Sequence, residues 1–147
     1  MKTVSSKWGT LSYELNEQGK LIALDFAETE QTDGSAPVWL VDMIERVERE
    51  GLQEIDRVWI DMNGTVFQQE VWDALLTIPS GETRTYKQIA EQIGRPKAVR
   101  AVGQALNRNP LPVIFPCHRV VGSSGQLTGF AGGLDQKQRL LDIEQVK

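Results

Sequence analysis

The sequence predicts a mixed α/β (α+β) fold in two parts: a small N-terminal α/β subdomain at residues 1–63 and a mainly helical domain at residues 64–147. Apolar residues alternate with polar ones near the beginning of the chain, helical spacing dominates after residue 64, and two helices there are separated by a very short turn. We therefore expect a short antiparallel sheet in the first part and a winged helix-turn-helix arrangement in the second.

A β-hairpin is expected near the beginning of the chain. Leu11–Leu15 alternates, Asn16–Gly19 has the composition of a turn, and Lys20–Phe26 is a second candidate strand. Two strands joined by so short a turn pair in antiparallel fashion, so the hairpin is the simplest arrangement.

An amphipathic helix should follow the acidic loop after this hairpin. Pro37 favours the beginning of the helix and Gly51 favours its end. Its apolar side is formed by Leu40, Met43, Ile44 and Val47. Val58–Ile60 is a candidate third strand, and the turn signal Asn63-Gly64 places the subdomain boundary near residues 61–64.

The second part begins with a helix from Thr65, which Pro79-Ser80-Gly81 should end. The apolar side of this helix consists of Phe67, Val71, Ala74, Leu75 and Ile78. A capping box of Thr85 and Gln88 then opens a short helix that Gly94 closes.

Pro96 suits the first turn of the next helix, Lys97–Asn107, which completes a candidate helix-turn-helix. One side of this helix is polar and basic and carries Arg100, Gln104, Asn107 and Arg108. Ala101 and Gly103 border that side. Such small residues suit either tight packing between helices or close approach to a DNA groove.

The charge of the chain is unevenly distributed. The net charge is −4 and the pI is about 5.1, which argue against a nucleic-acid partner, but residues 81–120 hold seven Lys/Arg against two Asp/Glu. A basic segment of this kind can attract phosphate although the whole chain is acidic. The alternative is a chance clustering of solvated charges.

The chain contains one cysteine and one histidine, Cys117 and His118. These numbers exclude an internal disulfide and a four-ligand structural zinc site. The first residues lack the apolar core of a signal peptide, and no stretch has the roughly 18 apolar residues of a membrane span. We therefore expect a soluble, cytoplasmic protein without a cofactor or a membrane partner.

Three prolines stiffen the apolar approach to Cys117, in the run Asn109-Pro110-Leu111-Pro112-Val113-Ile114-Phe115-Pro116. A lone cysteine in an apolar run is commonly an inert core residue. A reactive cysteine needs a thiolate, which His118 and Arg119 could stabilise. Adjacent residues of a strand face opposite ways, so a partnership of Cys117 with His118 requires a turn or a helix.

The segment Pro116-Cys117-His118-Arg119-Val120 resembles the active-site signature of the O6-alkylguanine-DNA alkyltransferases, also called methylated-DNA–protein-cysteine methyltransferases. Further similar segments occur in the same order and spacing: Phe67–Trp72, Ile78–Gly81, Thr85-Tyr86, Arg95–Gly103, Asn109-Pro110 and Gly132–Leu134. The resemblance covers residues 64–145. The first 63 residues resemble a shortened form of the family's N-terminal domain.

The resemblance implies that Cys117 attacks the alkyl carbon on guanine O6, with His118 as a base acting through water. It assigns to Glu144 the orientation of the imidazole and to Tyr86 a hydrogen bond to the departing base. The spacing of Glu144 from Leu140 and Leu141 supports an inward position on a C-terminal helix. The alternatives are a terminal surface carboxylate at Glu144 and a packing role for Tyr86.

The resemblance also implies that the nucleotide is flipped out of duplex DNA, with Arg100 filling the space it leaves. The DNA-contacting residues would be Ala98, Ala101, Gly103 and Ser123 together with Arg100. Without the family, Arg100 would be an ordinary surface arginine.

The substrate pocket implied by the resemblance contains Asn109, Pro112, Val120, Phe130, Ala131 and Gly132. Asn109 would brace the turn ahead of the active-site segment, and the carbonyls of Val120 and Cys117 would face the guanine amino group. Ala131 replaces a common serine but keeps the backbone N–H, and Val66 replaces a common proline.

The resulting hypothesis is direct-reversal DNA repair by a suicide methyltransferase, which acts once as a monomer on double-stranded DNA containing O6-alkylguanine, with O4-alkylthymine as an alternative lesion. One alternative is a non-catalytic alkyltransferase-like protein that binds lesions, although such relatives typically lack the cysteine. Another is a helix-turn-helix transcription regulator with Cys117 as a redox switch.

Overall fold

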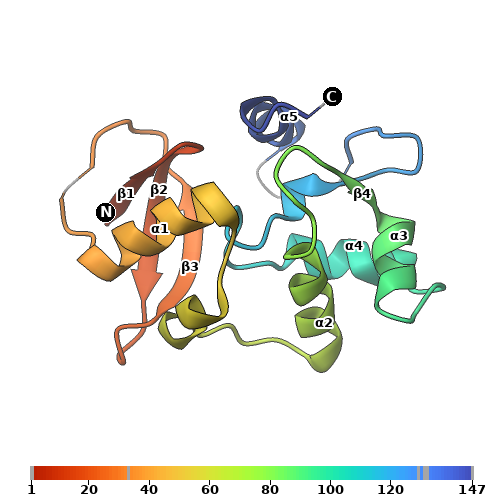
Figure 1. Cartoon of the computed structure of the whole chain (residues 1–147), viewed down its shortest axis with the longest axis horizontal. Helices are drawn as coiled ribbons and strands as arrows, with labels where there is room; N and C mark the ends of the chain where they lie inside the picture. Colours follow the sequence, from red (N-terminus) through yellow and green to blue (C-terminus); the bar gives the residue numbers. More distant parts are fainter. Residues whose placement is uncertain (1, 33, 129, 131–132, 147) are drawn as a thin grey trace. The chain divides into compact units, whose positions relative to one another are not determined.

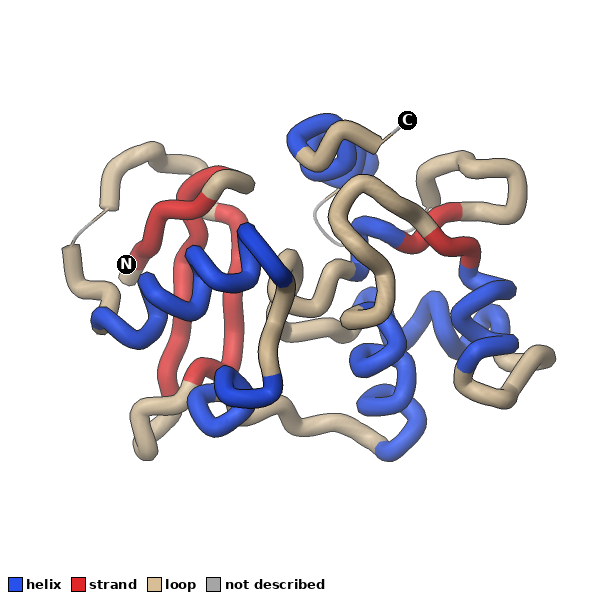
Figure 2. Tube along the Cα trace, in the orientation of Figure 1, coloured by secondary structure: helices blue, strands red, loops and turns tan. Residues whose placement is uncertain are grey.

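The computed structural model describes residues 2–32, 34–128, 130 and 133–146. They form two compact units, one of Met1–Asn63 with Pro110–Ile114 and one of Gly64–Asn109 with Phe115–Lys147. The first unit combines a sheet with helices and the second is mainly helical (Figure 2), so the predicted mixed α/β class is confirmed.

Unit 1 is built on a three-stranded antiparallel sheet in the order β1-β2-β3, over which α1 lies (Figure 1). The strands are β1 (Thr3–Ser6), β2 (Gly9–Leu15) and β3 (Leu21–Phe26), and α1 spans Val38–Glu50. The predicted hairpin is the β2–β3 pair, with Leu11 opposite Phe26. As predicted, Pro37 and Gly51 flank α1, whose buried side is Leu40, Met43, Ile44 and Val47.

The predicted strand at Val58–Ile60 is wrong. Residues Glu54–Trp59 form the 3₁₀ helix η1, and Ile60 makes only an isolated bridge to Leu21. A reciprocal capping box of Gln53 and Asp56 begins this helix, and Arg46 holds the buried Asp56 carboxylate at 2.8 Å. These polar contacts outweigh the β preference of Val58 and Trp59.

Pro110–Ile114 belongs to unit 1 although it lies far along the chain from the rest of that unit. The Leu24 N–H donates to the Pro110 carbonyl at 2.9 Å, and Leu111, Val113 and Ile114 are buried. The division after Asn63 falls within the predicted boundary region, whereas this return of the chain was not predicted.

Unit 2 is mainly helical. Its helices are α2 (Val66–Leu75), α3 (Tyr86–Gln92), α4 (Val99–Asn107) and α5 (Leu134–Ile143), together with the 3₁₀ turn η2 (Cys117–Arg119). Two short strands, β4 (Arg84–Thr85) and β5 (Val120–Val121), pair in parallel. A capping box of Thr65 with Gln68 begins α2. A second capping box, of Thr85 with Gln88, begins α3 as predicted.

Helices α3 and α4 form the predicted helix-turn-helix, packed on α2. The predicted beginning of α4 at Lys97 is two residues early. The Ala98 N–H closes a turn on the Arg95 carbonyl at 2.9 Å, so Pro96 lies in that turn rather than in the helix. The Trp72 indole N–H donates to the Ala105 carbonyl at 2.9 Å and fixes α2 to α4.

A close approach at the start of α2 requires glycine. A Cβ atom at Gly64 would lie 2.6 Å from the Trp72 ring, so any larger residue would displace the indole that joins α2 to α4. Across the described residues, no helix has both the length and the apolar character needed to cross a membrane.

Candidate active site

The only cysteine lies in a buried 3₁₀ turn. Pro116 precedes the turn, the Arg119 N–H donates to the Pro116 carbonyl at 3.0 Å, and Cys117, His118 and Arg119 are all buried. Helices α2 and α5 pack against this turn. The turn therefore provides the non-extended geometry that a partnership between adjacent Cys117 and His118 requires.

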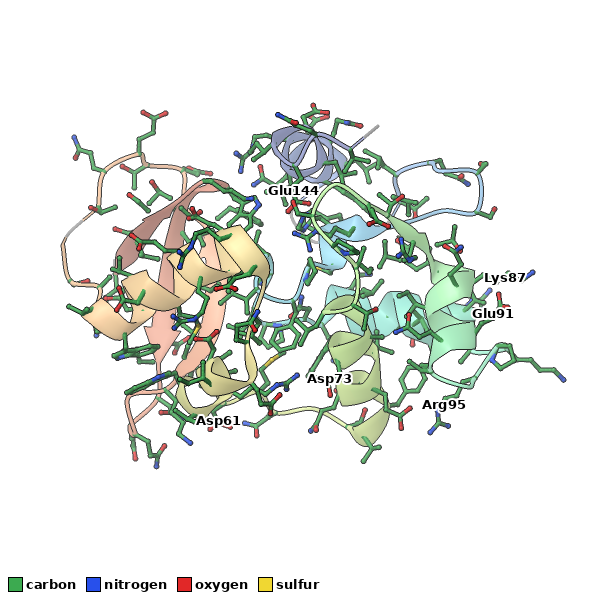
Figure 3. The ribbon with its side chains drawn as sticks, viewed as in Figure 1. Asp61, Asp73, Lys87, Glu91, Arg95 and Glu144 are labelled. Carbon is green, nitrogen blue, oxygen red and sulfur yellow. The ribbon has the colours of Figure 1, made fainter. Side chains whose placement is uncertain are left out.

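Glu144 joins two side chains of this turn. Its Oε1 lies 2.8 Å from His118 Nε2 and 2.9 Å from Arg119 Nε, and its Oε2 accepts a hydrogen bond from Arg119 Nη2 at 2.6 Å. Arg119 also donates to the Ile78 carbonyl at 2.8 Å. Figure 3 shows Glu144 directed from the end of α5 toward the interior of unit 2, where it is buried. The inward position predicted from its spacing is therefore correct.

The electrostatics of this cluster define the tautomer of His118. Burial alone would raise the pKa of Glu144, but the hydrogen bonds from Arg119 and His118 outweigh it and lower the pKa to about 2. Burial lowers the pKa of His118, so its imidazole is neutral near pH 7. A carboxylate only accepts hydrogen bonds, so Nε2 carries the hydrogen and Nδ1 is the basic nitrogen. Nδ1 hydrogen-bonds to no protein atom among the described residues.

The Cys117 thiol is not preformed as a thiolate by its surroundings. Burial raises its pKa, while a hydrogen bond from Asn109 and the charge of Lys137 oppose that rise. Arg119, which we expected to stabilise a thiolate, instead pairs with Glu144. A buried thiol with a raised pKa needs a base, and the unprotonated Nδ1 of neighbouring His118 can serve as one.

Glu144→Gln should destabilise the protein by about 3–5 kcal/mol, because it leaves the buried Arg119 guanidinium without its counter-ion. The folded-state pKa of Glu144 lies below its ordinary value of 4.5, so its contribution is present above about pH 4.5 and is lost as the pH falls toward 2. Denaturant unfolding at pH 7 and pH 3 should show a smaller acid-induced loss in the variant. Glu91→Gln, at an exposed site on α3, is the control and should change neither value. An equally stable Glu144→Gln would contradict the ion pair.

Tyr86 and Lys137 meet at one backbone carbonyl. The Tyr86 hydroxyl donates to the Thr128 carbonyl at 3.0 Å, and the Thr128 hydroxyl donates back to the Tyr86 oxygen at 3.0 Å. Lys137 Nζ donates to the same carbonyl at 2.9 Å and lies 5.8 Å from the centre of the Tyr86 ring. Tyr86 therefore has a polar role in addition to its packing.

Lys137 and Thr128 were missed by the sequence analysis. The signal for Lys137 was present, because it lies three and four residues before Leu140 and Leu141 on the side of α5 that also carries Glu144. The spacing argument applied to Glu144 would have found it.

The exposed side of α4 carries Arg100, as predicted. Three of the seven cations in residues 81–120 are held in ion pairs: Arg84 with Glu82, Arg95 with Glu70 and Arg119 with Glu144. The remaining four are exposed and have no ion pair within the described parts of the chain: Lys87, Lys97, Arg100 and Arg108. The basic surface is thus smaller than the charge count suggested. Figure 3 shows Lys87 extending away from α3.

The small residues Ala98, Ala101 and Gly103, at the start of α4 and within it, are partly exposed. A Cβ atom at Gly103 would lie 3.8 Å from the Tyr86 ring, which is an ordinary van der Waals distance. Packing against Tyr86 therefore does not by itself require glycine at this position.

Asn109 acts more directly than predicted. Its Nδ2 donates to the Phe115 carbonyl at 2.8 Å, which is the predicted brace, and its side chain also hydrogen-bonds to Cys117. Val120 begins β5, and its N–H donates to the Cys117 carbonyl. These contacts connect the end of α4, the thiol and β5 within unit 2.

The remaining predicted pocket residues are less closely tied to this cluster. Ser123 is exposed in the turn after β5, and the Phe130 carbonyl accepts from the Gly133 N–H at 2.9 Å. Pro112 belongs to unit 1. Ala131 and Gly132 lie outside the described residues. No group of three His, Cys, Asp or Glu suited to a metal ion occurs in the described part of the chain.

Comparison with known proteins connects this arrangement to one family. Residues 66–146 match the family model described as the DNA binding domain of 6-O-methylguanine DNA methyltransferase. The methylated-DNA–protein-cysteine methyltransferases of Mycobacterium leprae and Methanosarcina barkeri are 62% identical over 86 residues and 63% identical over 82 residues. These matches cover 58% and 56% of this chain and 52% of each relative, so they span about half the length of those proteins.

Two solved structures are similar over different lengths. Mycobacterium tuberculosis OGT in complex with DNA is 42% identical with a TM-score of 0.79, over 98% of this chain and 91% of that chain. S. pombe Atl1 in complex with damaged DNA containing O6-carboxymethylguanine is 34% identical with a TM-score of 0.51, over 58% of this chain and 82% of that chain.

Proposed function

This chain belongs to the O6-methylguanine DNA methyltransferase family, and from that membership we propose that it repairs DNA by moving an alkyl group from guanine O6 to Cys117. The observation that carries the proposal is the buried thiol beside a neutral imidazole whose Nε2 is fixed by Glu144. That arrangement supplies a nucleophile, a base and an orienting carboxylate in one turn and one helix end.

The chemical step begins with transfer of the thiol proton to His118 Nδ1 through a water molecule. The thiolate sulfur then bonds to the alkyl carbon as the bond from that carbon to O6 breaks, and the bonding electrons leave with guanine. The guanine anion is finally protonated, so the proton lost by the thiol is returned. A thioether has no good leaving group, and the chain has no second cysteine to exchange with, so each molecule acts once.

Tyr86 must change its hydrogen bonds during this reaction if it assists the leaving group. Its hydroxyl now donates to the Thr128 carbonyl, and it has to turn toward the base in order to donate there. Lys137 donates to the same carbonyl, so this acceptor keeps a donor when Tyr86 turns away.

The proposed partner is double-stranded DNA, bound by a monomer through α4. Guanine O6 is paired inside the duplex, so the nucleotide has to be extruded before sulfur can reach the alkyl carbon. The exposed cations Lys87, Lys97 and Arg108 would bind phosphate, and Arg100 would enter the space left by the flipped nucleotide. The same chemistry would apply to O4-alkylthymine if the pocket admits it.

The same site argues against the two alternatives. A protein that only binds lesions has no use for a cysteine beside a fixed base. A redox switch is favoured by an exposed thiol with a low pKa, whereas Cys117 is buried and its pKa is raised.

Incubation with a duplex oligonucleotide containing O6-methylguanine should add one methyl group per protein molecule, located on Cys117. Intact-protein mass spectrometry followed by peptide mapping measures this stoichiometry directly. Undamaged duplex is the control and should leave the mass unchanged. Multiple turnover, or loss of the lesion with Cys117 unmodified, would contradict the proposed function.

A further inference from the structure

Thr128 makes two hydrogen bonds with one atom of Tyr86. Its backbone carbonyl accepts a hydrogen bond from the Tyr86 hydroxyl at 3.0 Å, and its side-chain hydroxyl donates to the Tyr86 oxygen, also at 3.0 Å. Among the described residues, the Thr128 hydroxyl donates to no other acceptor. Thr128 therefore holds the Tyr86 oxygen through both its backbone and its side chain.

The fold brings these two residues together although they lie 42 positions apart in the chain. Strands β4 and β5 pair in parallel, with Thr85 opposite Val121. Parallel strands run in the same direction, so the chain leaves both strands at the same end of the pair. Tyr86 follows β4 directly as the first residue of α3, and the loop that carries Thr128 follows β5. The contact between Tyr86 and Thr128 is thus a consequence of the strand pairing.

The two hydrogen bonds differ in what the reaction requires of them. Before Tyr86 can donate to the departing base, its hydrogen has to leave the Thr128 carbonyl. Rotation about the bond between the ring and the oxygen moves this hydrogen without moving the ring. The Thr128 hydroxyl donates to a lone pair of the Tyr86 oxygen, and this lone pair remains available when the hydrogen points elsewhere. Donation by Thr128 therefore persists while donation by Tyr86 is redirected.

We propose that Thr128 is a positioning residue for alkyl transfer, whose hydroxyl fixes the Tyr86 oxygen and strengthens its hydrogen bond to the departing guanine. A donor to the phenol oxygen polarises the O–H bond, because hydrogen bonds in a chain strengthen one another. Negative charge develops on guanine as the bond from the alkyl carbon to O6 breaks, and the Tyr86 oxygen shares part of it. No proton leaves Thr128. This inference rests on the proposed function and adds a residue to it.

The test is the single-turnover rate of benzyl transfer from O6-benzylguanine to Cys117, followed by mass spectrometry, because the free base requires no nucleotide flipping. Thr128→Val keeps the shape of the side chain and removes the hydroxyl. It should slow transfer about fivefold, which is the effect of one ordinary hydrogen bond. Thr128→Ser keeps the hydroxyl and should retain most of the wild-type rate. The matched control is Thr77→Val, which removes a threonine hydroxyl with two hydrogen bonds of its own in unit 2 and should leave the rate unchanged.

Two further measurements separate an action through Tyr86 from support of the fold. Tyr86→Phe removes the direct donor and should slow transfer about a hundredfold. Adding Thr128→Val to that variant should slow transfer no further, because the oxygen to which Thr128 donates is gone. Bromine at C8 of O6-benzylguanine withdraws electrons and makes guanine a better leaving group. Thr128→Val should therefore slow the reaction of this brominated base less than that of O6-benzylguanine.

Four results would overturn the role of Thr128: an unchanged rate in Thr128→Val, an equal loss in Thr128→Ser, an equal loss when Tyr86 is already phenylalanine, or losses of the same size on the two leaving groups. If Thr128→Val does not fold, Thr128→Ala removes the same hydroxyl. Failure of both variants to fold would show that the hydroxyl supports the fold, which would also overturn the proposal.

Failure of this inference is distinguishable from failure of the proposed function. Alkyl transfer by the unmutated chain, with an unchanged rate in Thr128→Val, would refute only the role of Thr128. Absence of transfer by the unmutated chain, from O6-methylguanine in duplex DNA and from the free base alike, would refute the proposed function itself.

Discussion

Cys117→Ser should reduce alkyl transfer to the uncatalysed background while duplex DNA binding is retained. The serine hydroxyl is a far weaker nucleophile than a thiol, and it gives up its proton to the neutral imidazole of His118 far less readily than a thiol does. Loss of the nucleophile from a hydrolase lowers its rate by about 10⁶-fold, and we expect a loss of this order. Single-turnover repair of O6-methylguanine and fluorescence anisotropy with the same duplex measure the two properties.

The variant should remain folded, because serine is close to cysteine in size and Asn109 can still hydrogen-bond to it. Cys117→Ala tests the same loss without a hydroxyl and should behave alike. Repair by Cys117→Ser at a rate comparable to the wild type would exclude Cys117 as the acceptor. A loss of DNA binding in both variants would instead show that the thiol supports the fold of the DNA-binding surface.

Local signals in the sequence predicted the elements that local interactions determine. The capping box of Thr85 and Gln88 begins α3 because both hydrogen bonds lie within four residues. Pro37 and Gly51 flank α1 through another local effect, because each acts through its own backbone conformation. Glu144 was placed correctly because helical spacing sets the side on which it lies.

Interactions between distant segments explain what was missed. The Val58–Ile60 strand was wrong because the buried Asp56 carboxylate binds Arg46, ten residues away, and stabilises a 3₁₀ helix. The four-residue β1 has little apolar character of its own and depends on its pairing with β2, where Val4 lies opposite Leu11.

The electrostatics of the candidate site also depend on distant segments. The sequence placed Arg119 beside the nucleophile, and no local pattern shows that Glu144, 25 residues later, pairs with it instead. The cation that does influence Cys117 is Lys137, which comes from another element. Sequence neighbours therefore identified the residue types of this site but not which charge acts on which atom.

Arg100→Ala should slow repair of duplex DNA by about two orders of magnitude at saturating DNA, because extruding a nucleotide costs a few kcal/mol that the inserted side chain offsets. Arg100 is exposed on α4 and makes no ion pair within the described residues, so it is free to enter the duplex. Reaction with the free base O6-benzylguanine should change little, since nothing has to be flipped. The measurement is the single-turnover rate at saturating duplex, compared with the rate on the free base.

Arg108→Ala provides the matched control, since it removes an exposed cation from the C-terminal end of the same helix. If Arg108 contacts a phosphate, its loss should weaken duplex binding, because each such contact releases counter-ions on binding. Lower salt or saturating DNA should restore the repair rate of this variant. Arg100→Ala should not be restored by either condition, because the flipping step follows binding. Equal losses on duplex and free base would mean that Arg100 supports the fold or the pocket. If the repair rate of Arg100→Ala recovered fully at saturating DNA, Arg100 would be a phosphate contact only. Another group would then have to fill the space that the flipped nucleotide leaves in the base stack.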